Sequence, residues 1–234
     1  MRALIRSMFD KAGVPVQSWR RGFSFDRTMA EHYLQLPSPH MLHVGCHYHL
    51  LCGWLNSDYF PISEKVMFLD ATRPFPFPDA SFDFIFSEHM IEHIPYPAGC
   101  AMLKECSRVM KPGGKIRIST PNLSFLIDLY LNENTDTWSR YRQWSHNKFA
   151  SWAPSSDAAF IVNNFVRDWG HQFIYDENAL RQALCTAGFI GITRCALNQS
   201  ASPELANLEN ESRMPSGFLA LETLTLEGMK AHSS

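Results

Sequence analysis

The segment from Met41 to Leu123 constrains the fold most, because short apolar runs alternate in it with polar turns and one helical pattern. Strand-like runs lie at residues 41–44, 82–86 and 115–120, and a helical pattern with Met102, Leu103, Cys106 and Val109 on one side occupies residues 99–110. Alternation of strands and helices predicts βαβ units and a parallel sheet. Further on, Asp176 predicts the start of a helix that ends before Gly188, and two more strand-like runs follow at residues 190–195 and 221–229.

Size and composition indicate one globular α/β domain. The chain has 234 residues, of which 45% are hydrophobic and 19% charged, and its formal net charge is −2. A balance of this kind excludes a disordered chain and gives no reason to expect binding to nucleic acid. The six cysteines form no Cys-x-x-Cys pair, so we expect free thiols and a cytoplasmic protein.

Residues 1–40 are expected to form an N-terminal helical cap or arm, with the main domain at residues 41–234. Among the first 30 residues, six are basic and two acidic. Such a segment could also be a targeting peptide or an interfacial segment in peripheral contact with a membrane. It lacks the apolar core of about 7–15 residues that a secretory signal needs, and no apolar stretch reaches the roughly 18 residues of a membrane span.

The pattern changes at about residues 131–175, where aromatic and polar residues are interleaved. The aromatic residues are Trp138, Tyr141, Trp144, Phe149, Trp152, Phe160, Phe165, Trp169 and Phe173. The stretch is too long for a simple connection and too aromatic for disorder. It is interpreted as an inserted helical segment that is either a lid over the carboxyl edge of the sheet or additional core.

Three positions suit a nucleotide cofactor at the carboxyl ends of the strands, where open parallel sheets bind ligands. Gly45 follows the first strand and permits close approach of the backbone. Asp58 has two oxygens that can accept both hydroxyls of a ribose. Asp70, followed by the backbone N–H of Ala71, can accept a hydrogen bond from the amino group of an adenine. A nicotinamide-binding domain is disfavoured, because the chain contains no Gly-x-Gly-x-x-Gly.

This order of motifs, with the turn Lys111-Pro112-Gly113-Gly114, resembles the class I S-adenosylmethionine (SAM)-dependent methyltransferases. The segment Ser87-Glu88-His89-Met90-Ile91-Glu92-His93 and the blocks at residues 163–165, 169–176 and 213–218 are similar to a subgroup of small bacterial members. The resemblance covers roughly residues 40–230. It implies a Rossmann-like, doubly wound, seven-stranded and mostly parallel sheet with an antiparallel last strand. It also implies SAM as cofactor, contacted by Gly45, Cys46, His47, Asp58, Asp70, Ala71, Ser87 and Glu88.

One position departs from the family pattern. The first loop of these enzymes generally reads Gly-x-Gly, whereas this chain has Gly45-Cys46-His47. Either His47 contacts the methionine carboxylate of the cofactor or the loop is reshaped. We also expect only about one helical turn between Cys46 and Gly53, since the connection is short for a crossover.

The resemblance implies methyl transfer to an oxygen or nitrogen of a small metabolite or a glycan unit. A hydroxyl acceptor benefits from a general base, and the candidates are His89, His171 and Glu88, with Glu92 and His93 nearby. On a helix, Glu88 and Glu92 would share one face and His89 and His93 another. His89 and His93 have metal-ligand spacing, but no third ligand is evident, so no metal site is predicted and His93 is assigned a structural hydrogen bond.

A second interpretation is a methyltransferase-like binding or scaffold protein without turnover, suggested by His47 in the glycine loop. The sequence makes no prediction of the oligomeric state.

Overall fold

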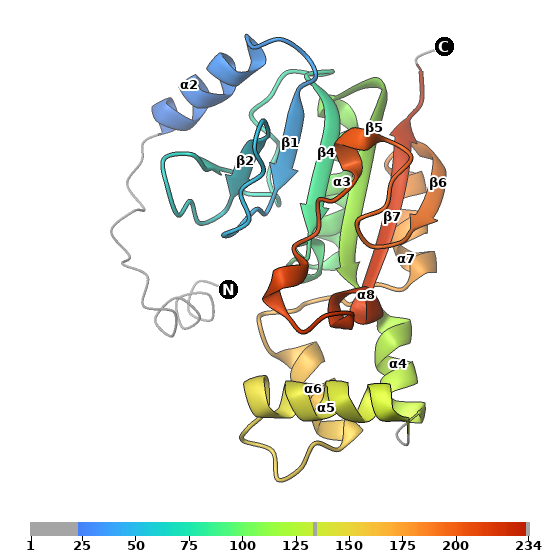
Figure 1. The fold of residues 1–234 in the computed structure, drawn as a ribbon. Helices are drawn as coiled ribbons and strands as arrows, with labels where there is room; N and C mark the ends of the chain where they lie inside the picture. Colours follow the sequence, from blue (N-terminus) through green and yellow to red (C-terminus); the bar gives the residue numbers. More distant parts are fainter. Residues whose placement is uncertain (1–22, 133–134, 233–234) are drawn as a thin grey trace.

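The computed structural model describes residues 23–132 and 135–232, and its centre is a seven-stranded sheet (Figure 1). The strand order is β3-β2-β1-β4-β5-β7-β6. The strands are β1 (Met41–Val44), β2 (Leu55–Asp58), β3 (Met67–Phe68), β4 (Phe82–Glu88), β5 (Met110–Pro121), β6 (Phe189–Cys195) and β7 (Thr223–Lys230). β1 to β5 pair in parallel, and β7 runs antiparallel to both β5 and β6. The predicted fold class, including the antiparallel last strand, is confirmed.

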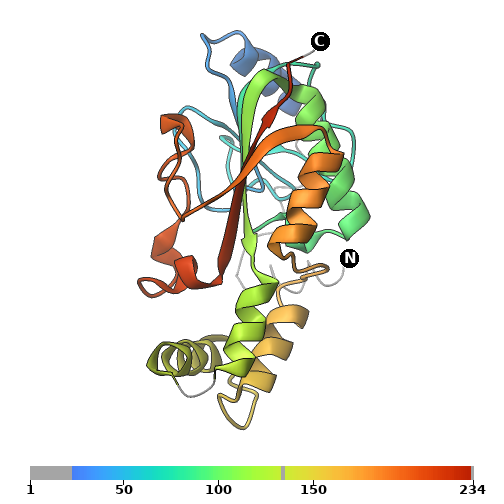
Figure 2. The same ribbon diagram turned by 90° about the vertical axis from the view of Figure 1, so that its right-hand side faces the viewer.

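Helices cover the sheet and extend beyond one of its ends. They are α2 (Phe23–Leu34), α3 (Tyr96–Val109), α4 (Leu123–Leu131), α5 (Asp136–Phe149), α6 (Ala158–Arg167), α7 (Glu177–Thr186) and α8 (Phe218–Glu222). Short 3-10 turns lie at η2 (Ile91–His93), η3 (Pro203–Leu205) and η4 (Glu211–Arg213). α3 and α7 lie on one face of the sheet, and the segment 196–217 lies on the other (Figure 2). In the described parts of the chain, no helix is both long and apolar enough to cross a membrane.

Local sequence explains why α7 begins and ends where it does. The Asp176 side chain accepts a hydrogen bond of 2.7 Å from the N–H of Ala179, which satisfies one donor of the first turn. Leu180, Ala183 and Leu184 are buried at helical spacing. Gly188 has φ +93°, a conformation in which glycine ends a helix without steric cost.

The connection from β1 to β2 contains turns and no helix, so the expected single helical turn between Cys46 and Gly53 is wrong. The residues between the two strands, 45–54, are too few to cross over the sheet and return with a helix. In place of a helix, Trp54 and Phe86 are covered by Leu205 and Leu208 of the segment 196–217.

The aromatic stretch forms helices beyond the carboxyl ends of the parallel strands. Figure 1 shows α4, α5 and α6 gathered at that end of the sheet. Their aromatic side chains build a second hydrophobic core, separate from the main one, around Phe125, Tyr141 and Phe165. This cluster is the additional core that one interpretation of the segment expects; the interpretation as a lid stays a prediction.

Candidate active site

The loop after β1 is shaped by a glycine whose position leaves no room for a Cβ unless its neighbours shift. Gly45 has φ +78°, and a Cβ built on it would lie 2.3 Å from Cγ of Met90. The N–H groups of Gly45 and Cys46 both donate to the carbonyl oxygen of Ser57, at 2.9 and 3.0 Å. The loop is thus bonded to the end of β2 and lies directly against the segment that follows β4.

His47 adopts the backbone conformation for which glycine is usual. Its φ is +44°, its N–H donates to Oδ2 of Asp58 at 2.9 Å, and its exposed ring packs edge-on against Tyr48. Asp58 ends β2 and accepts a second bond of 2.8 Å from the N–H of Phe60. Burial raises the pKa of Asp58, and these backbone donors oppose the rise.

Asp70 lies beside Asp58 because the N–H of Leu69 donates to the carbonyl oxygen of Asp58 at 2.9 Å. One Asp70 oxygen accepts from the N–H and the hydroxyl of Thr72, at 2.9 and 2.6 Å, which fixes a local turn. Ala71, the next residue, is 9% exposed and belongs to the main core. The predicted cofactor positions after β1, β2 and β3 are therefore neighbours at the carboxyl ends of adjoining strands.

The segment at residues 88–93 is not a helix, so the predicted sharing of helical faces is wrong. Glu88 is the last residue of β4 and is still paired with Ser119 of β5. His89 then takes φ +46°, and only residues 91–93 form a 3-10 turn. Continued pairing of β4 with β5 determines this course, because the N–H of His89 also bonds to the Ser119 carbonyl at 2.7 Å.

The Glu88 carboxylate is held by the segment 196–217. It accepts from the N–H of Asn210 at 3.2 and 3.3 Å and lies 3.4 Å from both Arg213 Nη2 and His49 Nδ1. Ser87, next to it, is buried, and its hydroxyl has no hydrogen-bond partner within residues 23–132 and 135–232. Glu88 therefore tethers a loop to the sheet in this structure.

His89 has both ring nitrogens near polar groups. Nε2 lies 2.9 Å from the hydroxyl of Thr223, and Nδ1 lies 3.6 Å from Oε1 of Glu92. Burial, reinforced by the positive charge of Arg213, lowers the pKa of His89 well below its usual value. The ring is therefore neutral near pH 7.

Glu92 lies at the centre of a cluster of histidines and is fully buried. Its Oε2 accepts from the hydroxyl of Thr120 at 3.1 Å. Among the described residues its Oε1 has no hydrogen-bond partner, and it lies 3.8 Å from Nε2 of His93. Burial raises the pKa of Glu92 to about 7.

His171 reaches this cluster from the segment that follows α6. Its Nδ1 lies 2.6 Å from the carbonyl oxygen of Phe165, so Nδ1 carries the proton and donates it. Its ring centroid lies 4.9 Å from that of His93, and burial lowers its pKa. His93 and Asp58 are close enough for the charge of each to affect the pKa of the other, which places the cluster near the first loop.

The structure brings His89 and His171 together and adds Glu92 and His93 to them. The partnership of Glu92 with His171 was missed from the sequence, since 79 positions separate the two residues and no local pattern connects them.

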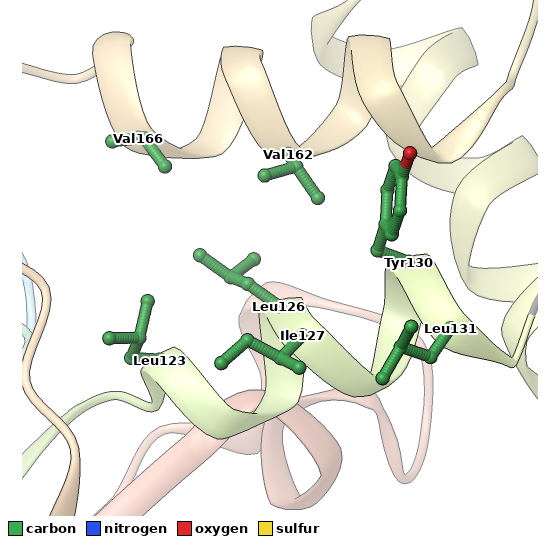
Figure 3. Close-up of a pocket in the computed structure, with 7 residues that line it drawn as sticks. All are labelled: Leu123, Leu126, Ile127, Tyr130, Leu131, Val162 and Val166. Atoms are coloured by element: carbon green, nitrogen blue, oxygen red, sulfur yellow. The ribbon is translucent and has the colours of Figure 1, made fainter.

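An apolar hollow lies between α4 and α6 (Figure 3). It is lined by Leu123, Leu126, Ile127, Tyr130, Leu131, Val162 and Val166. Among these only Tyr130 carries a side-chain polar atom, so the hollow offers little of the polar chemistry that the histidine cluster provides.

Comparisons with known proteins find similarity in the part of the chain that contains the first loop. A family model described as "Methyltransferase domain" matches residues 42–118, which run from β1 into β5. The ubiquinone biosynthesis O-methyltransferase of Idiomarina loihiensis is 37% identical over 73 residues, covering 30% of this chain and 29% of that protein. The same enzyme of Nitrosococcus oceani is 48% identical over 42 residues, covering 18% of this chain and 17% of that protein. The chain thus matches less than a third of the length of these relatives.

Among solved structures, a SAM-dependent methyltransferase from Archaeoglobus fulgidus is similar with a TM-score of 0.50 and 15% identity, over 92% of this chain and 97% of that one. This likeness concerns the fold. Residues 42–118, which include the glycine loop bonded to Asp58, match a methyltransferase domain, and the fold of the whole chain is similar to that of a class I SAM-dependent methyltransferase.

Proposed function

We propose that this protein transfers a methyl group from SAM to an oxygen or nitrogen of a small metabolite or a glycan unit. The observation that carries the proposal is the first loop, Gly45 to His47, folded against Asp58 at the carboxyl ends of β1 and β2. Oxygen is the acceptor atom named for the relatives from Idiomarina loihiensis and Nitrosococcus oceani, and we favour it for this chain.

The residues at this edge fit the cofactor. We propose that Asp58 holds the ribose hydroxyls, since each of its oxygens accepts one backbone bond and retains a lone pair for a further donor. Gly45 and His47, both with positive φ, would present the loop backbone to the methionine part. The remaining proposed contacts are Cys46, Asp70, Ala71, Ser87 and Glu88. When bound, SAM supplies a methyl group on a positively charged sulfonium.

The protein's part in such a transfer is chiefly to position the acceptor about 3–3.5 Å from the methyl group, in line with the bond that breaks. Of the three catalytic candidates, Glu88 is held by Asn210 and Arg213, and His89 is held by Thr223. His171 donates through Nδ1, which leaves the lone pair of Nε2 available. We therefore assign activation of the acceptor to His171, with Glu88 and His89 in supporting positions.

The alternative of a binding protein without turnover depended on His47. Its backbone has the left-handed conformation that a glycine would supply, so the substitution gives no reason to favour that alternative. All six cysteines are free thiols, which supports the proposed cytoplasmic location.

Titration calorimetry with SAM and S-adenosylhomocysteine tests the cofactor site. We expect micromolar binding of both by the unaltered protein, weakened at least tenfold in Asp58→Asn, because charged hydrogen bonds are worth about 1.5–3 kcal/mol. Asp136→Asn is the matched control, since that carboxylate is exposed on α5. Absence of binding by the unaltered protein, or equal affinities in both variants, would refute the assignment.

A further inference from the structure

Three side chains around Glu92 form a set of metal ligands. One carboxylate oxygen of Glu92 and one ring nitrogen each from His93 and His171 all lie within 4.8 Å of one another. We propose that these three residues bind a divalent transition-metal ion, with zinc(II) as the ion that suits them best. No metal was predicted from the sequence, because no third ligand was evident beside His89 and His93. The fold brings two other ligands, Glu92 and His171, to His93.

The buried Glu92 carboxylate is suited to binding a cation. Its side chain is 0% exposed, and no residue in the described part of the chain hydrogen-bonds to Oε1. The nearest histidine nitrogens, on His89 and His93, are 3.6 and 3.8 Å from Oε1, beyond normal hydrogen-bond length. An unsatisfied buried carboxylate oxygen is costly, and a cation bound to Oε1 removes that cost.

The surrounding hydrogen bonds orient the ligands as in known metal sites, where a ligating histidine donates its other ring N–H to a carbonyl or carboxylate. His171 does so through Nδ1 to the Phe165 carbonyl, which turns Nε2 into the ligand atom. Glu92 is oriented in the same way, since its second oxygen accepts from Thr120.

Backbone bonds bring the two segments together without any ion. The N–H groups of Gln172 and Phe173 both donate to the carbonyl oxygen of Glu92, at 2.8 and 3.2 Å. The Gln172 side chain donates to the carbonyl oxygen of His93 at 2.8 Å. The ligands are therefore held in place beforehand, so binding an ion requires only a small contraction of the cluster.

The donor set favours zinc over the alkaline-earth ions. Two imidazoles and one carboxylate are a common zinc set in enzymes and leave a fourth position open, whereas magnesium and calcium prefer oxygen ligands throughout. With an ion bound, Nε2 of His171 would be a ligand and no longer a free base, and the ion would take over activation by favouring the ionised form of an acceptor hydroxyl at the open position. That role rests on the proposed function; the metal site itself does not.

Titration of the full chain with zinc(II) alone tests the site. The protein is purified without a histidine tag and treated with a chelator, and binding is followed by calorimetry, with cobalt(II) absorption spectra as a second readout. We expect one ion per chain. Glu92→Gln and His171→Ala should each weaken binding on the order of 100-fold, at or above the loss caused by changes to outer-shell partners. His32→Ala, on the exposed face of α2, should leave it unchanged.

Titration of the same samples with SAM separates the two proposals. Metal binding that depends on Glu92 and His171, with or without SAM binding, supports the metal site. No stoichiometric zinc binding by the unaltered protein, or equal binding in all three variants, overturns it. If Glu92→Gln does not fold, His171→Ala decides the question, since its side chain is only partly buried.

Discussion

At the scale of single residues, the first loop shows two different demands on the backbone. Gly45 and His47 both have positive φ, which disfavours side chains with a Cβ. Only at Gly45 is the space for that Cβ already filled, by Met90. His47 is exposed and has room for its ring. The loop therefore tolerates a histidine where the family pattern has its second glycine, whereas position 45 favours glycine.

Replacing Gly45 by alanine separates steric overlap from backbone strain. We expect Gly45→Ala to lower the free energy of unfolding by about 2–4 kcal/mol, from strain at positive φ and overlap with Met90, and to abolish SAM binding. Gly191→Ala is the control, because Gly191 also has positive φ but no atom lies within 4 Å of the place its Cβ would occupy. It should cost only about 1 kcal/mol. Urea unfolding of both variants measures the difference, and equal losses would contradict the proposed overlap.

At the scale of helices and strands, local sequence patterns predicted the structure correctly where no long-range strand pairing competed with them. The start of α7 at Glu177, its end before Gly188 and the strand β6 were predicted from an N-cap, a glycine and apolar spacing, and the structure confirms them. The course of residues 88–93 was not predictable in this way. Pairing of Glu88 with Ser119 overrides the helical spacing of the charged residues, and that pairing involves residues far apart in the sequence.

The candidate site likewise has one part that could be predicted from the sequence and one part that could not. Gly45, Asp58 and Asp70 follow strands that adjoin in the sheet, so their proximity follows from the topology of a parallel sheet. The meeting of Glu92 with His171 depends on how α4, α5 and α6 fold beyond the sheet, and no periodic pattern in the sequence encodes that arrangement.

Two helix starts provide a test of capping strength. Asp176 at the start of α7 accepts a bond from Ala179, whereas Asp157 at the start of α6 makes no capping bond through its side chain. We expect Asp176→Ala to destabilise the protein by about 1 kcal/mol and Asp157→Ala to change it by less than about 0.5 kcal/mol. Thermal unfolding of the two variants compares them. A larger loss in Asp157→Ala would disprove the assigned cap.

At the scale of the whole molecule, one buried ion network joins the segment 196–217 to the sheet. Arg117 of β5 is fully buried and donates to Glu209 at 2.6 Å and to Glu227 at 2.5 Å. It also donates to the carbonyl oxygens of Gln199 and Ala196. The network fixes the position of a segment that contains little regular secondary structure.

Removing this arginine leaves the carboxylates of Glu209 and Glu227 without their cationic partner in the interior. We expect Arg117→Met to destabilise the protein by about 3–5 kcal/mol, as in other broken buried ion pairs. Arg140→Met removes an exposed pair with Asp136 on α5 and should change stability by no more than about 0.5 kcal/mol. Chemical denaturation followed by tryptophan fluorescence measures both, and a loss below about 1 kcal/mol in Arg117→Met would show that the network is not stabilising.

The absence of a helix between β1 and β2 has a consequence for how the chain folds while it is being synthesised. Trp54 and Phe86 belong to the first half of the chain, yet Leu205 and Leu208 are what covers them. A nascent chain that has just completed β5 therefore presents an uncovered apolar face, and more than 80 further residues must leave the ribosome before that face closes. Folding of this domain is therefore completed only after the segment 196–217 has left the ribosome, and the apolar face stays exposed until then.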